Sequence, residues 1–327
     1  MSVSTKLIPG WLAGYSRGKL GADVAAGLIV TVLVIPQSLA YALLAGLPPQ
    51  TGLYVSIFPV IAYALLGSSM VQAVGPVAIT AIMTYSVLTP LAAPGSPQYV
   101  AFAATLSLIS GVMVLACGFM RLGFLSQLLS RPGISGFISG SAILIVISQM
   151  KYLLGVTSDG GNGWELALDL LTKTPQVHGP TAAIGLTALA ALIFVKAGLT
   201  GLLLRVGMDA GKAAFVGRLM PLAVVLFGTL AVVHWDLDTR SGVPVVGAIV
   251  EGLPAFTFFL PGYDAISPLI KPAFVLTLVG MVQNLSMAQA LAIKRRERVD
   301  ANAELVGLGA ANVVAAFYGG MPVGGGV

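Results

Sequence analysis

The sequence is short of both charge and cysteine. Only 9% of its 327 residues are Asp, Glu, Lys or Arg, whereas a soluble globular domain carries about 25% charged residues. The single cysteine, Cys117, excludes a disulfide framework and a cysteine-rich metal site. With so little charge, the chain cannot form the polar surface that a soluble enzyme needs. A disordered chain is excluded too, because such chains are rich in charge and poor in hydrophobic residues. With 57% hydrophobic residues, an all-α polytopic membrane protein is the class that remains.

Long uncharged stretches hold the predicted membrane spans. Residues 24–120 contain no charged residue, and because one crossing needs about 20 apolar residues, several crossings must share this stretch. Turn residues divide it into predicted helices near 24–46, 52–67, 77–91 and 98–120. Further uncharged runs occupy 132–150, 174–195, 219–235, 272–293 and 305–327. We predict eight spans, a ninth near 303–318 and the start of a tenth where the chain ends.

Lys and Arg are distributed unevenly between the two predicted sides of the membrane. With a cytoplasmic N-terminus, only four of the 17 fall outside, namely Lys151, Lys173, Arg240 and Lys271. This asymmetry follows the positive-inside rule, so the basic balance indicates topology and does not indicate nucleic acid. We expect a multi-pass protein of the cell (inner) membrane. Residues 163–171 predict a short amphipathic helix on its outer surface.

Polar residues beside a proline mark the first predicted span. Pro36 lies in its middle, removes one backbone hydrogen bond and predicts a kink or an unwound turn. Gln37 and Tyr41 follow four residues apart, so both side chains lie on one helix face. An amide and a phenol in hydrocarbon need partners, which are either neighbouring helices or a transported ligand. Because Pro36 lies beside them, we favour a transported ligand over neighbouring helices as the partner of these two side chains.

A second break precedes a short apolar segment. Gly75 and Pro76 stand directly before it, which predicts a helix that begins inside the membrane with Pro76 in its first turn. The free N–H groups and partial positive charge of such a helix start would hold an anion without using a charged residue.

The helix breaks recur at one offset. Residues 37–42 and 283–288 share the pattern Q-x-L-x-x-A, and Pro76-Val77 recurs as Pro322-Val323. Both differences, 283 − 37 and 322 − 76, equal 246. An odd number of predicted spans precedes the second copy, so the two repeats would have opposite orientations in the membrane. Inverted repeats with matching helix breaks are typical of secondary transporters.

The same stretches resemble the signatures of the SulP anion permeases. The resemblance is carried by residues 23–28, 35–42, 46–54, 74–78, 131–137 and 148–155, and it extends from about residue 20 to the chain end. It implies fourteen spans in two inverted seven-span repeats. A core domain would hold the anion between half-helices three and ten and move, elevator fashion, against a gate domain. Most members also carry a cytoplasmic STAS domain.

The resemblance further implies which residues form the site. Its substrate-binding positions correspond to Gln37, Tyr41, Val77, Ala78, Gly325, Gly326 and Val327. Core-domain parts would occupy 1–131, with the half-helix at 77–91, and 272–327, while 132–271 would belong to the gate domain. The C-terminal spans and the STAS domain would be absent. A homodimer formed through those absent parts is expected, and no cofactor or metal ion.

Gln283 departs from the family pattern. Many proton-coupled members have a glutamate here, in a Gly-x-x-Glu setting that matches residues 280–283. Because glutamine cannot titrate, we expect coupling to Na⁺, exchange of anions, or a proton carried by another group.

Several functions remain open at this level. Sulfate is the default substrate from the resemblance, and bicarbonate, a dicarboxylate or anion exchange are alternatives. A nucleobase carrier of the same architecture usually has carboxylates in span eight, where Gln283 and Asn284 supply amides. A membrane-embedded enzyme would rely on His178 and His234, which lie near outer span ends without an H-E-x-x-H pair. A purely structural protein would leave the paired breaks unexplained. We therefore predict a transporter and not an enzyme.

Overall fold

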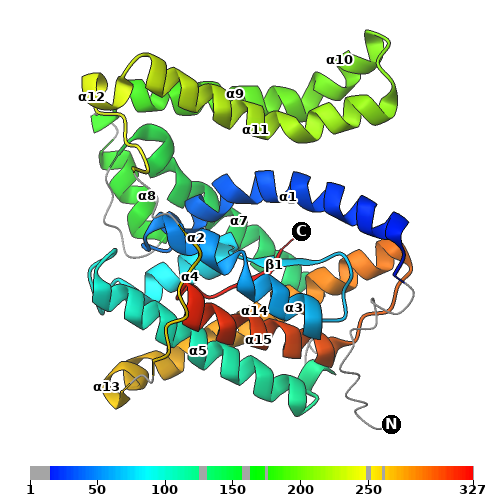
Figure 1. Cartoon of the computed structure of the whole chain (residues 1–327). Helices are drawn as coiled ribbons and strands as arrows, with labels where there is room; N and C mark the ends of the chain where they lie inside the picture. The colour runs from blue at the N-terminus through cyan, green and yellow to red at the C-terminus, as the bar shows by residue number, and fades with distance from the viewer. Residues whose placement is uncertain are drawn as a thin grey trace. The chain divides into compact units, whose positions relative to one another are not determined.

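The computed structural model describes residues 15–124, 131–156, 163–173, 176–247, 252–259 and 262–326. Within these residues the chain is almost entirely helical, with one pair of short strands (Figure 1). The elements up to residue 156 are α1 (Arg17–Leu44), α2 (Pro49–Val55), α3 (Phe58–Leu66), β1 (Ala73–Gly75), α4 (Ala78–Leu88), α5 (Pro97–Phe119), η2 (Leu122–Phe124) and α7 (Arg131–Leu154). The later elements are α8 (Gly163–Thr172), α9 (Gly179–Phe194), η4 (Val195–Leu199), α10 (Thr200–Arg205), α11 (Ala210–His234), α12 (Leu237–Ser241), α13 (Tyr263–Ile266), η5 (Ser267–Leu269), α14 (Ile270–Arg295), α15 (Ala301–Tyr318) and β2 (Gly324–Gly326).

Five helical stretches among the described residues are long and apolar enough to cross a membrane. They are Arg17–Leu44, Pro49–Leu66, Pro97–Phe119, Gly179–Arg205 and Tyr263–Ile293. A sixth candidate combines Ala210–Gly217 with Leu219–His234, which meet at an angle of 41°. Large apolar side chains on these stretches are exposed, for example Phe119 and Phe227, as expected of side chains that face lipid.

The chain forms two compact units. The first comprises residues 1–23, 37–145 and 249–327, and it contains the strands together with α2 to α5 and α13 to α15. The second comprises residues 24–36 and 146–248, including α8 to α12.

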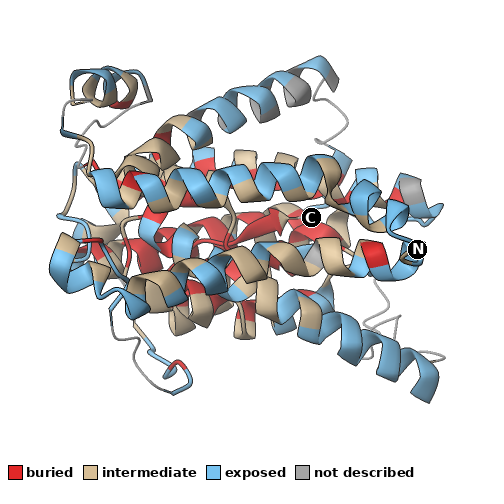
Figure 2. Cartoon of the chain, turned by 90° about the horizontal axis from the view of Figure 1, so that it is seen from above, coloured by how far each residue is buried: buried red, intermediate tan, exposed pale blue. Residues whose placement is uncertain are grey.

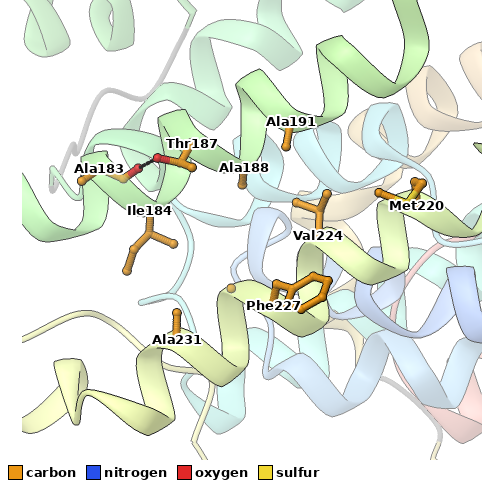
Figure 3. Close-up of a pocket in the computed structure, with 10 residues that line it drawn as sticks. Ala183, Ile184, Thr187, Ala188, Ala191, Met220, Val224, Phe227 and Ala231 are labelled. Carbon is orange, nitrogen blue, oxygen red and sulfur yellow. Dashed lines mark hydrogen bonds between the residues drawn. The ribbon is translucent and has the colours of Figure 1, made fainter. Parts of the chain in front are cut away.

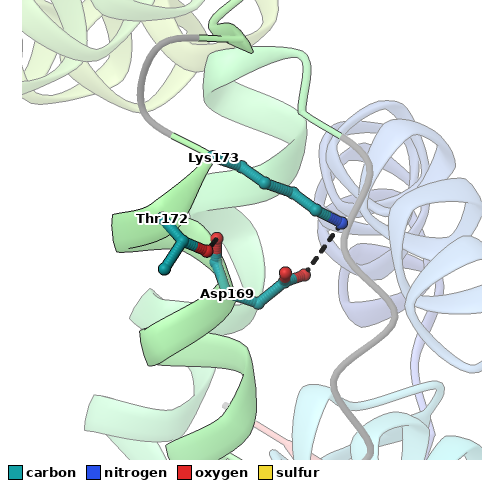
Figure 4. Close-up of polar contacts among 3 residues, drawn as sticks. All are labelled: Asp169, Thr172 and Lys173. Carbon is teal, nitrogen blue, oxygen red and sulfur yellow. Dashed lines mark hydrogen bonds and ion pairs between the residues drawn. The ribbon is translucent and has the colours of Figure 1, made fainter.

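In the second unit, α8 confirms the short helix predicted at 163–171. An ion pair between Lys173 Nζ and Asp169 Oδ2 (3.2 Å) joins residues one turn apart, and the hydroxyl of Thr172 donates to the Asp169 carbonyl (2.9 Å) (Figure 4). Trp164 on the same helix is 74% exposed. Polar pairs and an exposed aromatic on one short helix are typical of a segment that lies along a membrane surface.

In the first unit, α5 and α15 pack closely through glycines. A Cβ added at Gly111 would lie 2.7 Å from the backbone N of Val313, and one at Gly309 would lie 2.5 Å from the backbone N of Leu115. Small residues let two membrane helices approach until their backbones touch. Buried residues concentrate along α15 and β2 as a result (Figure 2).

Three details differ from the predictions. The helix predicted at 52–67 is divided into α2 and α3 around Ser56 and Ile57. At Pro36 we predicted a kink or an unwound turn; the unwound turn is wrong, because α1 continues through the proline, and the kink stays a prediction. The half-helix begins at Ala78, so Pro76 precedes the helix and does not lie in its first turn.

Candidate functional site

The two predicted breaks meet in an antiparallel ribbon in the first unit. β1 pairs with β2, and Ala73 lies opposite Gly326, Val74 opposite Gly325, and Gly75 opposite Gly324. In Figure 1 the ribbon lies near the marked C-terminus. Residues about 250 positions apart are thereby placed side by side. Each strand adjoins one of the two Pro-Val steps of the sequence.

The ribbon leads directly into α4. Val77 is the N-cap, with extended backbone, and no side chain caps the helix within the described chain. The first backbone N–H groups of a helix have no intrahelical partner, so those of Ala78 and the next residues remain available to a ligand. The Val77 side chain lies over β2, because a Cβ added at Gly324 would come within 2.8 Å of Val77 Cγ2. The start of α4 and the strand β2 are therefore neighbours.

Three amide side chains surround Gly325. Gln283 Nε2 donates to the Gly325 carbonyl (3.2 Å). Gln72 Nε2 donates to Asn284 Oδ1 (2.7 Å) and to the Asn284 carbonyl (3.3 Å). This amide pair occupies the space that a side chain at residue 325 would need, since an added Cβ would collide with Gln72 Nε2 and Asn284 Oδ1. The amides predicted in span eight thus lie against the second strand.

The same amides retain unused hydrogen-bonding atoms. Gln72 Oε1, Gln283 Oε1 and Asn284 Nδ2 are buried and have no partner among the described residues. Gln72 is 7% exposed and Asn284 is 0% exposed. A buried polar atom without a partner costs about 1–3 kcal/mol, so a bound water, ion or substrate at the ribbon would be stabilised by these atoms.

Asn312 on α15 fixes the segment that enters β2. Its Oδ1 accepts from the backbone N of Val323, and its Nδ2 donates to the carbonyls of Val323 and Leu308, each at 3.0 Å. Asn312 is buried. The Ser107 hydroxyl on α5 donates to the Asn312 carbonyl (2.9 Å), so the ribbon is anchored to the packed helices beneath it.

Gln37 and Tyr41 form a pair of their own. Gln37 Nε2 donates to the Tyr41 hydroxyl oxygen (3.2 Å), which confirms that both side chains lie on one face of α1. Gln37 is exposed and Tyr41 half-buried. No hydrogen bond within the described chain joins this pair to the ribbon. The phenolic proton of Tyr41 therefore remains available for a ligand.

The predicted site residues fall into three groups. Val77, Ala78, Gly325 and Gly326 meet at the ribbon, and Gln283 joins them. Gln37 and Tyr41 form the separate pair on α1. Val327 lies outside the described residues. Sequence reasoning missed Gln72 and Asn312, although a lone amide beside a Gly-Pro break and an amide in a predicted span both signal burial of a polar group.

Two cavities contain none of the predicted site residues. One, of about 470 Å³, lies between α9 and α11 in the second unit (Figure 3). It is lined by Ala183, Ile184, Thr187, Ala188, Ala191, Met220, Val224, Phe227, Gly228 and Ala231. Its Thr187 hydroxyl already donates to the Ala183 carbonyl (2.6 Å). The other cavity, of about 400 Å³, lies beside α5 in the first unit, near Gln98 and Asp264. The ribbon, with its unpaired amides, is the better candidate for a polar substrate.

Each histidine lies at a helix end. His178 caps α9 through its Nδ1, which contacts the Thr181 hydroxyl at 2.7 Å, and His234 is the last residue of α11. Across the part of the chain that the structure describes, no cluster of three His, Cys, Asp or Glu side chains could hold a metal ion.

Together, these features define a multi-pass α-helical membrane protein with a polar ribbon at a helix start, the architecture of a secondary transporter. The chain belongs to the sulfate permease family, whose model matches residues 20–327. The family and the all-α membrane fold predicted from the sequence are thereby confirmed. Because the family consists of permeases, the alternatives of a membrane-embedded enzyme and a purely structural protein are removed.

Known proteins agree in sequence and in fold. "Probable sulfate transporter MT1781" of Mycobacterium tuberculosis is 37% identical over 332 residues, covering 98% of this chain and 55% of that protein. The chain thus spans about half the length of the curated relatives it matches. The murine Slc26a9 anion transporter, solved in the inward-facing state, gives a TM-score of 0.85 at 26% identity and covers 100% of this chain and 56% of that one. The transmembrane domain of the cyanobacterium bicarbonate transporter BicA shares the fold, with a TM-score of 0.77 at 24% identity over 95% of this chain and 76% of that one.

Proposed function

We propose that this chain forms the anion-binding part of a secondary active transporter of inorganic anions, with sulfate as the first substrate to test. The anion would bind between the start of α4 and the segment that follows β2, and an elevator-type movement would expose it alternately to the two sides. The observation that carries this proposal is the uncapped first turn of α4, at Ala78, beside the amide-lined ribbon.

The geometry favours an anion over a cation or a neutral solute at the helix start. α4 has 11 residues, which is about 16 Å of helix, roughly half of the ~30 Å hydrocarbon core. A helix of this length beside a buried ribbon is expected to begin within the membrane. Its free N–H groups carry about half a positive charge, and the Tyr41 hydroxyl and Asn284 Nδ2 are further donors without a described acceptor. Oxyanions need several donors. The start of α4 and Asn284 supply donors at the ribbon, and we propose that Tyr41 reaches the same anion from α1.

Coupling is proposed to occur without a proton on residue 283. The side chain of Gln283 donates to Gly325, and its Oε1 is an acceptor without a described partner. A neutral amide oxygen suits Na⁺ or water and does not titrate. Sodium-coupled uptake, exchange for another anion and proton transfer on a different group are the three candidate modes.

Transport assays with the reconstituted protein test this function. Uptake of labelled sulfate into liposomes would be measured with and without sodium and pH gradients, and unlabelled bicarbonate and a dicarboxylate would serve as competitors. Gln37→Ala and Tyr41→Ala should each reduce sulfate uptake about fivefold or more, since each removes one polar group from the substrate path. Gln98→Ala, at an exposed amide on α5, is the matched control. Normal uptake by both α1 variants would contradict the proposed site.

Other properties of the whole protein are proposals at the same level. These are a cytoplasmic N-terminus, location in the inner membrane, a homodimer, and a division into core and gate parts. The last is supported in part by the two compact units, which separate near residues 145 and 249 where boundaries at 131 and 271 were predicted, although residues 24–36 of the predicted core part group with the second unit.

A further inference from the structure

We propose that Glu304 on α15 is a positioning residue for the anion site. It would hold the segment between α3 and β1, and thereby the ribbon and the start of α4, in the geometry that binds the anion. This inference rests on the proposed function and adds a residue that the anion itself does not touch.

The Glu304 carboxylate is buried and contacts four donors. It is 0% exposed. Oε2 accepts from the Tyr63 hydroxyl at 2.5 Å. Oε1 accepts from the backbone N of Ser68 (2.7 Å), the Ser68 hydroxyl (2.8 Å) and the backbone N of Ser69 (2.7 Å). The partners lie 235 to 241 residues from Glu304 in sequence, so this one side chain joins α15 to α3 and to the connection after α3.

The Glu304 side chain suits these contacts because it offers two acceptor oxygens to four donors. No ion pair to Glu304 is found among the residues described, so these four hydrogen bonds stabilise the buried group. Together they clamp the connection after α3 to α15.

The backbone is also brought close at this clamp. A Cβ added at Gly307, one turn beyond Glu304, would lie 2.9 Å from both Cα and N of Gly67. In addition, the backbone N of Asp300 donates to the Ser68 hydroxyl oxygen at 3.0 Å. The connection after α3 is therefore held against α15 by packing as well as by hydrogen bonds.

A continuous path of hydrogen bonds leads from Glu304 to the ribbon. Ser69, which donates its N–H to Glu304, accepts at its own hydroxyl oxygen from the backbone N of Gln72 (3.3 Å). The Gln72 side chain then binds Asn284, and this amide pair lies against Gly325. Releasing Glu304 would free the residues that place Gln72 and β1, so we expect the helix start at Ala78 to lose its fixed distance from β2.

The experiment separates positioning from folding by two readouts. The first is the KM and maximal rate of labelled sulfate uptake in liposomes. Loss of folded protein lowers the maximal rate at constant KM, whereas a displaced site raises KM. The second readout needs no transport: Ala73→Cys and Gly326→Cys lie directly opposite each other in the ribbon, at a separation suited to a disulfide. The rate of their oxidation would be measured in a cysteine-free background that includes Cys117→Ala.

Four variants define the result. Glu304→Ala should raise the KM about tenfold and slow the formation of the disulfide at least threefold, because both acceptor oxygens are lost. Glu304→Gln should restore most of the KM and most of the disulfide rate, because its amide oxygen can still accept hydrogen bonds from the connection after α3. Tyr63→Phe, which removes one donor of four, should raise the KM about fivefold. Tyr99→Phe is the matched control, because its buried hydroxyl donates to the Ala45 carbonyl (2.7 Å) away from this path, and its KM should not change.

Unchanged KM and unchanged disulfide rate in both Glu304→Ala and Tyr63→Phe would overturn the proposal. If the unaltered protein carries neither sulfate nor bicarbonate nor a dicarboxylate, the proposed function fails, and the disulfide rate alone decides the positioning role. If Glu304→Ala does not fold, the comparison of Tyr63→Phe with Tyr99→Phe decides whether the positioning role holds.

Discussion

Replacing Gly325 by alanine tests the amide cluster more directly than any other change. The new Cβ would collide with Gln72 Nε2 and Asn284 Oδ1 and would lie 3.1 Å from Asn284 Cα. The Cα belongs to the backbone of α14 and cannot move aside, so the 2.7 Å bond between Gln72 and Asn284 must break. Breaking it leaves two buried groups unpaired at about 1–3 kcal/mol each. We expect Gly325→Ala to destabilise the protein by about 2–6 kcal/mol.

The matched control is the next residue on the same strand. A Cβ at Gly326 would meet Val77 Cγ1 at 3.4 Å and the Ala73 carbonyl oxygen at 3.7 Å, which are ordinary contacts. Gly326→Ala should therefore change stability by less than about 0.5 kcal/mol. Thermal unfolding of both variants in detergent gives the comparison. Gln72→Ala should partly rescue Gly325→Ala, because it removes one of the two colliding atoms. Equal unfolding midpoints for the two glycine variants would refute the packing argument.

Two further predictions concern the coupling position and the anchor of β2. Gln283→Glu introduces a group that can titrate, so we expect sulfate uptake to become dependent on a pH gradient. The role given to Gln283 would be contradicted if uptake by the unaltered protein were already driven by a pH gradient and did not change in this variant. Asn312→Ala leaves the buried N–H of Val323 without its acceptor and should lower the free energy of unfolding by about 2–4 kcal/mol. The control is Ser86→Ala, which removes an exposed hydroxyl hydrogen bond within α4 and should hardly change stability. Similar unfolding midpoints for the two variants would argue against Asn312 as the anchor of β2.

Local chemistry was enough to predict the helix start after Gly75 and Pro76, but not that α1 and α14 continue unbroken through Pro36 and Gln283. Gly75 and Pro76 indicate a helix start whatever the rest of the chain does, because each acts on its own backbone. The amides Gln283 and Asn284 stand out in an apolar span for the same reason. The resemblance to the family then added roles for Val77 and Ala78 that spacing alone does not carry.

Contacts over long sequence distances were beyond local reasoning. β2 consists of three glycines, which have no strand preference, so the ribbon arises from the packing around it. The pairing of Gln72 with Asn284 spans 212 residues, and no periodicity in the sequence predicts it. Glu304 was recognisable in principle, since a carboxylate inside a predicted span is a functional signal, but its partners were not.

The uncharged character of the ribbon has an electrical consequence. The amides around Gly325 are neutral, and no lysine or arginine is buried among the residues whose exposure the structure describes. A sulfate carried there would keep its two negative charges while crossing the membrane field. At 100 mV, each elementary charge corresponds to about 2.3 kcal/mol, so inward movement against an inside-negative voltage would cost about 4.6 kcal/mol per sulfate. Under the proposed function, accumulation of an anion bound by these neutral groups then requires accompanying cations or an outgoing anion, because the groups themselves offset none of the charge that is moved.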